Sequence, residues 1–209
     1  MNENMMEKIS ENLRIKFDIV SSTLSAREEL VGKIKKIHTC DNKNILWSKT
    51  NAFSIIPFYN ELMGYKSGKM QFKNPRAKKN TYCYFASDEN IDKIVSYNSK
   101  GEVGDESFIV RENNEVMEIR REANGEFIAL SQVFLDELKR PLTAYFVNDE
   151  GDITGYHYFY DGAFIKKILT VSNNSPLKFV ILSCDYNTDG VIDRIYFINK
   201  GREVVIYPR

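Results

Sequence analysis

Cysteine and histidine are scarce in this chain, which has three cysteines and two histidines among 209 residues. Cys40, Cys83 and Cys184 are odd in number and far apart, so they predict neither a disulfide framework nor a Cys-x-x-Cys metal site. His38 and His157 are too few for a zinc site built on histidine pairs. The chain is therefore expected to fold without disulfides or zinc, in a reducing, cytoplasmic compartment.

Long apolar runs are also missing, and no stretch approaches the roughly 18 apolar residues that a membrane-spanning helix needs. The N-terminal sequence MNENMMEKISENLRIKF has no cationic start followed by an apolar core, so it does not predict a signal peptide. These absences predict a soluble, cytoplasmic protein with no membrane partner. Export would require a signal that has already been removed.

No charge of one sign is in excess, because 29 Lys and Arg balance 29 Asp and Glu. This balance disfavours nucleic acid as a partner, although it leaves room for local asymmetry. Catalytic signatures are missing too, since the chain has no GxSxG, no P-loop and no HExxH. His157 has no visible nucleophile or orienting carboxylate beside it, so no catalytic residue is assigned.

The first third of the chain has helical periodicity. Apolar residues recur at three- and four-residue steps between Glu3 and Val20, and again between residues 30 and 37. A short third helix is predicted to begin near Pro57 and to end at Gly64. Residues 44–56, which lie between these helices, fit either a strand or a helix.

Residues 65–80 differ from their surroundings because they contain six basic residues and no acidic one. The segment predicts an exposed loop between a helical region, 1–80, and a second region, 81–209. Tyr65 and Phe72 alternate with the bases, a pattern that also fits lysines tracking phosphates while aromatic rings stack on bases. A solvated loop is the simpler interpretation.

Turn-forming residues separate short runs rich in Val, Ile, Tyr and Phe from residue 81 to the end of the chain. Asn-Gly and Asp-Gly suit tight hairpins, and many of these turns are 11 or 12 residues apart, which is the rhythm of a meander. The predicted fold class is α+β, with N-terminal helices followed by an antiparallel β-meander as an open sheet or partial barrel. One short inserted helix is predicted at Ser131–Leu138, ending before Pro141.

One of these turns carries a resemblance. Val95-Ser-Tyr-Asn-Ser-Lys-Gly-Glu-Val103 resembles the tyrosine- and aspartate-containing (YD) hairpin repeats of bacterial Rhs proteins. Segments 158–165 and 196–201 are looser versions, and the resemblance as a whole extends over about half of residues 95–209. The resemblance implies a bacterial hairpin protein, and the alternative is hairpin chemistry that arose independently.

Asp185–Asp193 places oxygen-bearing side chains at loop positions 1, 3, 5 and 9, with glycine at position 6, a spacing that suits Ca²⁺. It resembles the start of an EF-hand loop, but position 12 is Tyr196 and both flanks resemble strands. The closer likeness is to the calcium loop of integrin-type propeller (FG-GAP) repeats. That likeness implies as ligands Asp185, Asn187, Asp189, Val191 and Asp193. Plain turn chemistry is the alternative, because Asp189-Gly190 alone explains a hairpin.

Residues 81–126 carry eleven acidic and five basic side chains, a net charge of −6. An acidic sheet surface would attract a basic partner, and the alternative is a charged surface that only keeps the sheet soluble. The candidate partner-binding residues are Glu102, Asp105, Glu106, Glu112, Glu115 and Glu118.

These observations favour a non-catalytic bacterial protein that binds another protein. The more specific hypothesis is an immunity-type partner that occludes the active site of a toxin with a basic surface. Two alternatives stay open: a calcium-stabilised extracytoplasmic module, with Ca²⁺ as its only cofactor, and an enzyme whose unrecognised site lies near His157.

Overall fold

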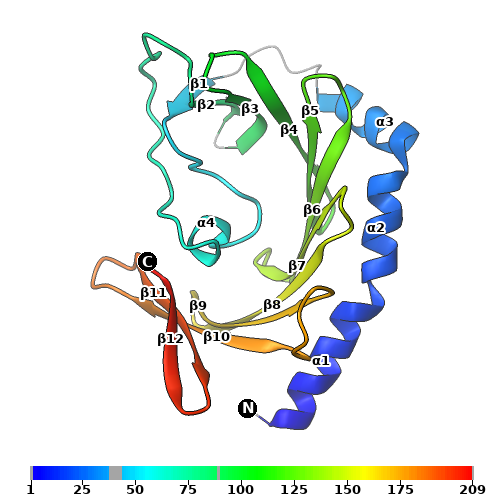
Figure 1. Cartoon of the computed structure of the whole chain (residues 1–209), viewed down its shortest axis with the longest axis vertical. Coiled ribbons are helices and arrows are strands. Elements are labelled where there is room, and N and C mark those ends of the chain that lie inside the picture. Colours follow the sequence, from blue (N-terminus) through cyan, green and yellow to red (C-terminus); the bar gives the residue numbers. More distant parts are fainter. Residues whose placement is uncertain (1, 38–43, 89, 209) are drawn as a thin grey trace.

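A single twelve-stranded antiparallel sheet forms the body of the protein, and its strands follow one another in sequence order (Figure 1). The computed structural model describes residues 2–37, 44–88 and 90–208. The strands are β1 (Asn44–Ser48), β2 (Tyr82–Ser87), β3 (Asn90–Tyr97), β4 (Val103–Glu112), β5 (Glu115–Glu122), β6 (Phe127–Leu135), β7 (Pro141–Asn148), β8 (Ile153–Asp161), β9 (Phe164–Ser172), β10 (Val180–Tyr186), β11 (Ile192–Asn199) and β12 (Arg202–Tyr207).

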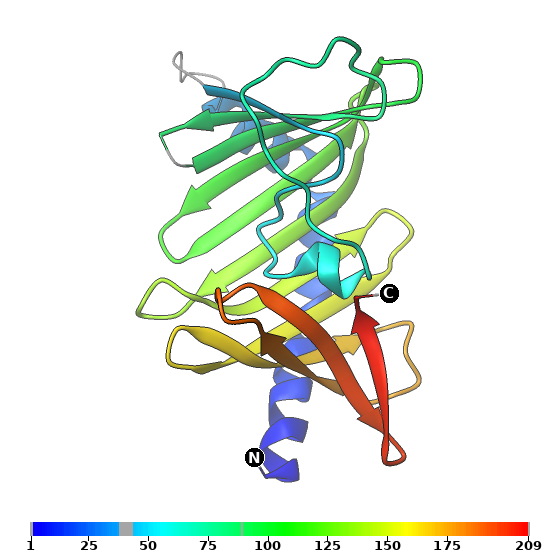
Figure 2. The same ribbon diagram turned by 90° about the vertical axis from the view of Figure 1, so that its left-hand side faces the viewer.

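The predicted open β-meander is confirmed, because each strand from β2 onward pairs with the next one along the chain. The predicted turns join these strands, and their glycines adopt the positive φ that such turns need, as at Gly101 (+83°) and Gly151 (+85°). The sheet curls as it proceeds, so it has an outer and an inner face (Figures 1 and 2).

The helix predicted at Ser131–Leu138 is wrong. Residues up to Leu135 belong to β6, and a turn follows at 136–140. β6 lies in the middle of the sheet with both faces covered, so residues 129–133 are all buried and the usual alternation of apolar and polar residues is lost. Asp136 shapes the turn, since its Oδ1 accepts hydrogen bonds from the backbone N–H of Leu138 and of Arg140, each at 2.9 Å.

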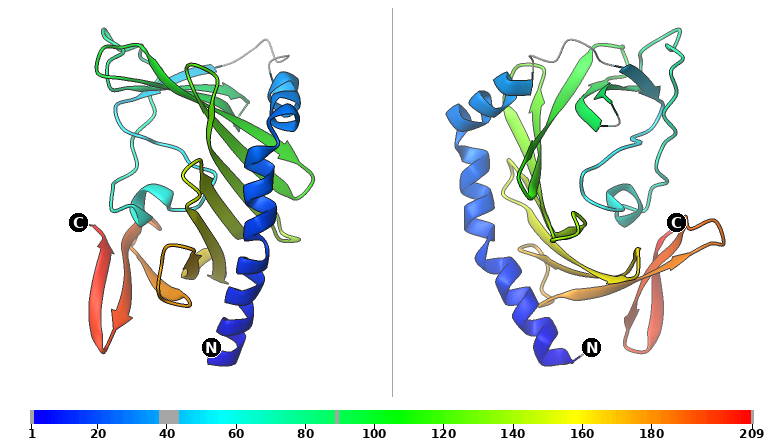
Figure 3. Two further views of the ribbon diagram at one scale, coloured as in Figure 1. Left: turned by 45° about the vertical axis from the view of Figure 1, so that its right-hand side comes forward. Right: turned by 180° about the vertical axis from the view of Figure 1, so that it is seen from behind.

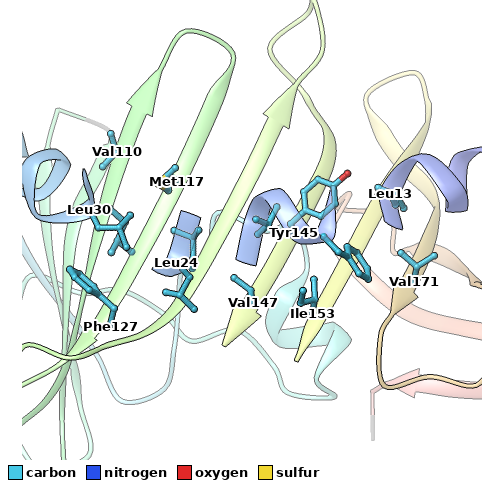
Figure 4. Close-up of a cluster of buried hydrophobic side chains, with 14 of the residues drawn as sticks. Leu13, Leu24, Leu30, Val110, Met117, Phe127, Tyr145, Val147, Ile153 and Val171 are labelled. Carbon is cyan, nitrogen blue, oxygen red and sulfur yellow. The ribbon is translucent and has the colours of Figure 1, made fainter. Parts of the chain in front are cut away.

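Three helices run end to end along the outer face of the sheet (Figure 3). They are α1 (Glu3–Ile15), α2 (Phe17–Ser25) and α3 (Arg27–Ile37). The predicted apolar stripe is confirmed, because Leu13, Val20 and Leu30 are buried against β4–β9 in one shared core (Figure 4). None of the described helices is long and apolar enough to cross a membrane.

Residues 49–80 cover the inner face of the sheet. The predicted third helix is confirmed as α4 (Tyr59–Leu62), and Gly64 follows it with a φ of +82°. Ile56 is 1% exposed and lies in a core with residues of β6–β11. Gln71 pairs with Trp47 through two backbone hydrogen bonds of 2.8 and 2.9 Å, so the loop also covers the outer edge of β1. Residues 1–80 thus contribute to the cores on both faces of the sheet.

Candidate functional site

An aromatic groove of about 760 Å³ opens on the inner face of the sheet. One wall is residues 52–61, and the other comes from residues 139–141 and from the β8–β9 and β10–β11 hairpin turns with the strand ends beside them. Figures 1 and 2 show α4 next to these C-terminal strands. Six rings line the groove: Phe53, Phe58, Tyr59, Tyr160, Phe164 and Tyr186.

Tyr186 stands at the centre of the wall made by the strands. Its ring centroid is 4.9 Å from that of Phe164 and 6.2 Å from that of Phe58, so it joins the two walls. Its hydroxyl donates a hydrogen bond of 2.8 Å to the carbonyl oxygen of Ile165. Burial raises the pKa of Tyr186 and raises the pKa of Tyr160 to about 12. Both phenols therefore stay protonated near neutral pH.

Arg140 is fixed beside these rings. Its guanidinium carbon lies 4.3 Å from the ring centroid of Tyr160, a cation–π contact. Its Nε and Nη2 bond Asp136 Oδ2 at 2.9 and 2.8 Å, and its Nη1 donates to the carbonyl oxygen of Gly162 at 3.1 Å. The hydrogen bond from the backbone N–H of Arg140, together with its guanidinium, lowers the pKa of Asp136. The guanidinium is thus held in one orientation at the edge of the groove.

Exposed apolar side chains border the groove on its open side. Phe164 is 44% exposed, Val191 is 57% exposed, and Leu138, which precedes Lys139 of the wall, is 71% exposed. The β6–β7, β8–β9 and β10–β11 turns meet here. Arg140 of the first bonds Gly162 of the second, and the Phe164 ring beside the second turn lies against Gly190 of the third. Large apolar side chains exposed together at a concave site are typical of binding surfaces.

Residues of the predicted calcium loop line part of this groove, and three of the five predicted ligands have hydrogen-bond partners within the chain. Asp185 Oδ2 accepts from Arg194 at 2.9 Å. Asn187 Oδ1 accepts from the backbone N–H groups of Asp189 and Val191, each at 3.0 Å. The Val191 carbonyl, another predicted ligand, accepts from the Asn187 N–H at 2.9 Å.

The oxygens of Asp185, Asn187 and Val191 are therefore engaged by donors within the chain. Within residues 2–37, 44–88 and 90–208, no three His, Cys, Asp or Glu side chains are close enough to hold a metal ion. Residues of the predicted metal site also stabilise the turn. Asn187 accepts hydrogen bonds from the turn's backbone, and Gly190 adopts the φ of +73° that the turn needs.

The six predicted partner-binding acids do not form one surface. Asp105 and Glu118 lie on the inner face, since Glu118 is paired across the strands with Ile109 of the inner core. Glu106, Glu112 and Glu115 point to the opposite face. Each is two residues away from a member of the helix-covered core, and residues two apart in a strand share a face. Glu102 lies in the turn before β4 and accepts a hydrogen bond from Asn98 at 3.1 Å.

Most of these acids have partners within the chain. Glu106 is paired with Lys93 and Arg121, and Glu112 with Lys33 and Lys36 of α3. Glu115 accepts from Gln132 at 3.1 Å. Glu118 is paired with Arg120, and Asp105 accepts from Ser96 at 2.8 Å. Because the net charge of −6 already counts Lys93, Arg120 and Arg121, only the ion pairs of Glu112 with Lys33 and Lys36 reduce the excess among these contacts.

His157, Cys83 and Cys184 do not line the groove, whereas Ser54, Glu61, Ser67 and Lys139 do. His157 lies on the helix-covered face opposite Leu169, 4.7 Å from the Phe159 ring, and burial lowers its pKa. Cys83 and Cys184 are buried, which raises the thiol pKa to about 11 and about 12. Such thiols are inert. His38 and Cys40 lie outside the described residues.

The aromatic groove joins chain segments that are far apart, and no motif in the sequence announces it. Its residues come from positions 52–61, 139–141, 160–165 and 186–192, together with Ser67. No protein-family model matches the chain, and the search of curated proteins finds no similar sequence.

Proposed function

We propose that this protein acts by binding another protein, which inserts apolar side chains into the aromatic groove. The observation that carries the proposal is the six-ring lining beside a fixed guanidinium and an exposed apolar rim. Tyr, Phe and Arg are enriched at the cores of protein interfaces. Because Arg140 and Tyr186 already have fixed orientations, little side-chain entropy is lost on binding.

The more specific form of the proposal is an immunity-type protein that blocks a bacterial toxin by occupying its active site. It is supported by the resemblance of the hairpin turns to Rhs repeats and by the distance of His157 and the buried thiols from the groove. The groove, and not the acidic residues, carries the expected contact, because those acids lie on different faces of the sheet and three of the six are ion-paired within the chain.

Co-expression with the product of the neighbouring gene tests this proposal. The wild-type protein is expected to restore growth to cells that make the neighbouring product and to elute with it as a 1:1 complex. The Phe164→Ala variant is expected to bind at least about tenfold more weakly, since truncation of a central aromatic costs about 2 kcal/mol or more.

The matched control is Phe72→Ala, which removes an equally large ring that is 75% exposed and lies outside the groove. This variant is expected to bind like the wild type. Melting temperatures of both variants show that they fold. A complex that Phe164→Ala leaves intact, or a neighbouring product that neither harms cells nor binds, would contradict the proposal.

A further inference from the structure

A second surface, at the β1 end of the sheet, gathers positive charge. Residues 44–80 contain seven bases and one acid, a net charge of +6, and that one acid, Glu61, is buried. All seven bases are exposed. They form what we call the basic surface: Lys49, Lys66, Lys69, Lys73, Arg76, Lys78 and Lys79. Figure 2 shows the segment that carries most of them running over the upper part of the molecule.

The basic surface is uncompensated. None of its seven side chains lies within ion-pair distance of a carboxylate in the described part of the chain, whereas Glu106, Glu112 and Glu118 are all paired. The net charge of zero for the whole chain therefore conceals a concentrated positive field at one end. Such a field attracts an anionic partner.

Two adjoining clefts lie within this surface. One, of about 810 Å³, is lined by Tyr59, Tyr65 and Tyr82 and by amide side chains. The other, of about 750 Å³, is lined by Lys73, Arg76 and Lys79. Lys49 and Asn80 line both clefts, so the two are neighbours.

Aromatic rings are interspersed with the cations and are open to solvent. Tyr65 is 70% exposed and Phe72 is 75% exposed, and neither is needed to fill a core. Nearby, the rings of Trp47 and Tyr97 stack at 5.8 Å, with Lys78 Nζ at 5.7 and 5.2 Å from their centroids. Planar rings beside lysines can stack on nucleobases while the ammonium groups approach phosphates.

We infer that the basic surface binds single-stranded nucleic acid. Six of its seven cations are lysines, which are depleted at protein interfaces but serve well as point charges for phosphate. Exposed rings can stack only on bases that are not already paired and stacked, which favours a single strand over a duplex. Asp105, in the first cleft, bonds Ser96 and could also accept from an exocyclic base amine.

Fluorescence anisotropy with a 5′-labelled 20-nucleotide oligothymidine tests the inference. Binding is expected at 50 mM salt and is expected to weaken steeply as salt rises, by a log–log slope of about −0.7 per phosphate contact. The triple variant Lys69→Gln, Lys73→Gln, Arg76→Gln is expected to flatten that slope by about 2. Phe72→Ala is expected to weaken binding about fivefold or more.

The matched control is Lys8→Gln, Lys35→Gln, Lys167→Gln, which removes the same charge from exposed positions elsewhere. It is expected to bind like the wild type. No binding of oligothymidine, an equal loss in both triple variants, or equal binding of duplex DNA would overturn the inference. Displacement by polyglutamate as readily as by unlabelled oligothymidine would also overturn it, because it would indicate an acidic protein as the partner.

The aromatic groove and the first cleft share Tyr59 and Asn60, but Phe164 lines only the groove and Phe72 lies outside it. Phe164→Ala should leave oligothymidine binding unchanged, and Phe72→Ala should leave the protein complex unchanged. These two variants therefore distinguish a loss of oligothymidine binding from a loss of the protein complex.

Discussion

Glu118 occupies a costly position for a carboxylate. Its side chain is 6% exposed on the inner face of β5, where it lies 3.4 Å from an Arg120 nitrogen. Burial opposes charge on Arg120, but the carboxylates of Glu118 and Asp105 outweigh it and raise the Arg120 pKa. The pair belongs to the fold and not to a partner-binding surface.

Glu118→Gln is therefore expected to lower the free energy of unfolding by about 2 kcal/mol, because Arg120 would lose its closest counter-charge in a poorly solvated place. The exposed Glu102→Gln should change it by less than about 0.5 kcal/mol. Urea denaturation of the two variants measures both values. Equal losses in the free energy of unfolding would show that the buried Glu118–Arg120 pair stabilises the fold no more than an exposed carboxylate does.

Calcium is not expected to stabilise the turn at 185–193. Asp185, Asn187 and the Val191 carbonyl already accept hydrogen bonds within the chain, so a cation would compete with those donors for the same oxygens. The melting temperature is expected to be the same in calcium and in chelator. A site filled at 100 times its Kd would add about 2.7 kcal/mol. That gain would raise the melting temperature by roughly 5–10 °C, and a rise of that size would restore the calcium interpretation.

At the level of elements, the close contact between α2 and the sheet requires glycine at position 155. A Cβ on Gly155 of β8 would lie 3.2 Å from Phe17 of α2 and 3.3 Å from Tyr145 of β7, closer than ordinary packing. Gly32 of α3, by contrast, has nothing within 4 Å of such a Cβ.

The same substitution should consequently have opposite effects at these two positions. Gly155→Ala is expected to lower the free energy of unfolding by about 1–3 kcal/mol through overpacking. Gly32→Ala is expected to raise it by about 0.5–1 kcal/mol, because alanine is the better helix former. Thermal and urea unfolding check both signs. A tolerated Gly155→Ala would mean that the helices are less tightly seated than the structure indicates.

Local patterns predict most elements of this fold, because each depends on neighbouring residues. The stripe between Glu3 and Val20 predicts helices, and the Asn-Gly and Asp-Gly turns predict hairpins. The failure at β6 has a tertiary cause. Coverage by helices on one face and by residues 49–80 on the other buries successive residues, and that removes the period of two that marks a strand.

The whole molecule has two surfaces that local patterns describe poorly. The aromatic groove requires four separate segments to meet, so it becomes visible only in the fold. The basic surface can be predicted in part from residues 65–80, and the structure adds that its seven cations have no carboxylate within ion-pair distance in the described part of the chain. Composition gives the total charge, whereas the fold shows which charged side chains are not ion-paired within the chain and can contact a partner.

The aromatic groove as a protein-binding site is the central claim, and calorimetric titration of the neighbouring gene product into three forms of this protein tests it most directly. The wild type and Phe72→Ala are expected to bind with equal affinity, and Phe164→Ala at least about tenfold more weakly. Equal affinity of Phe164→Ala and the wild type would contradict the claim.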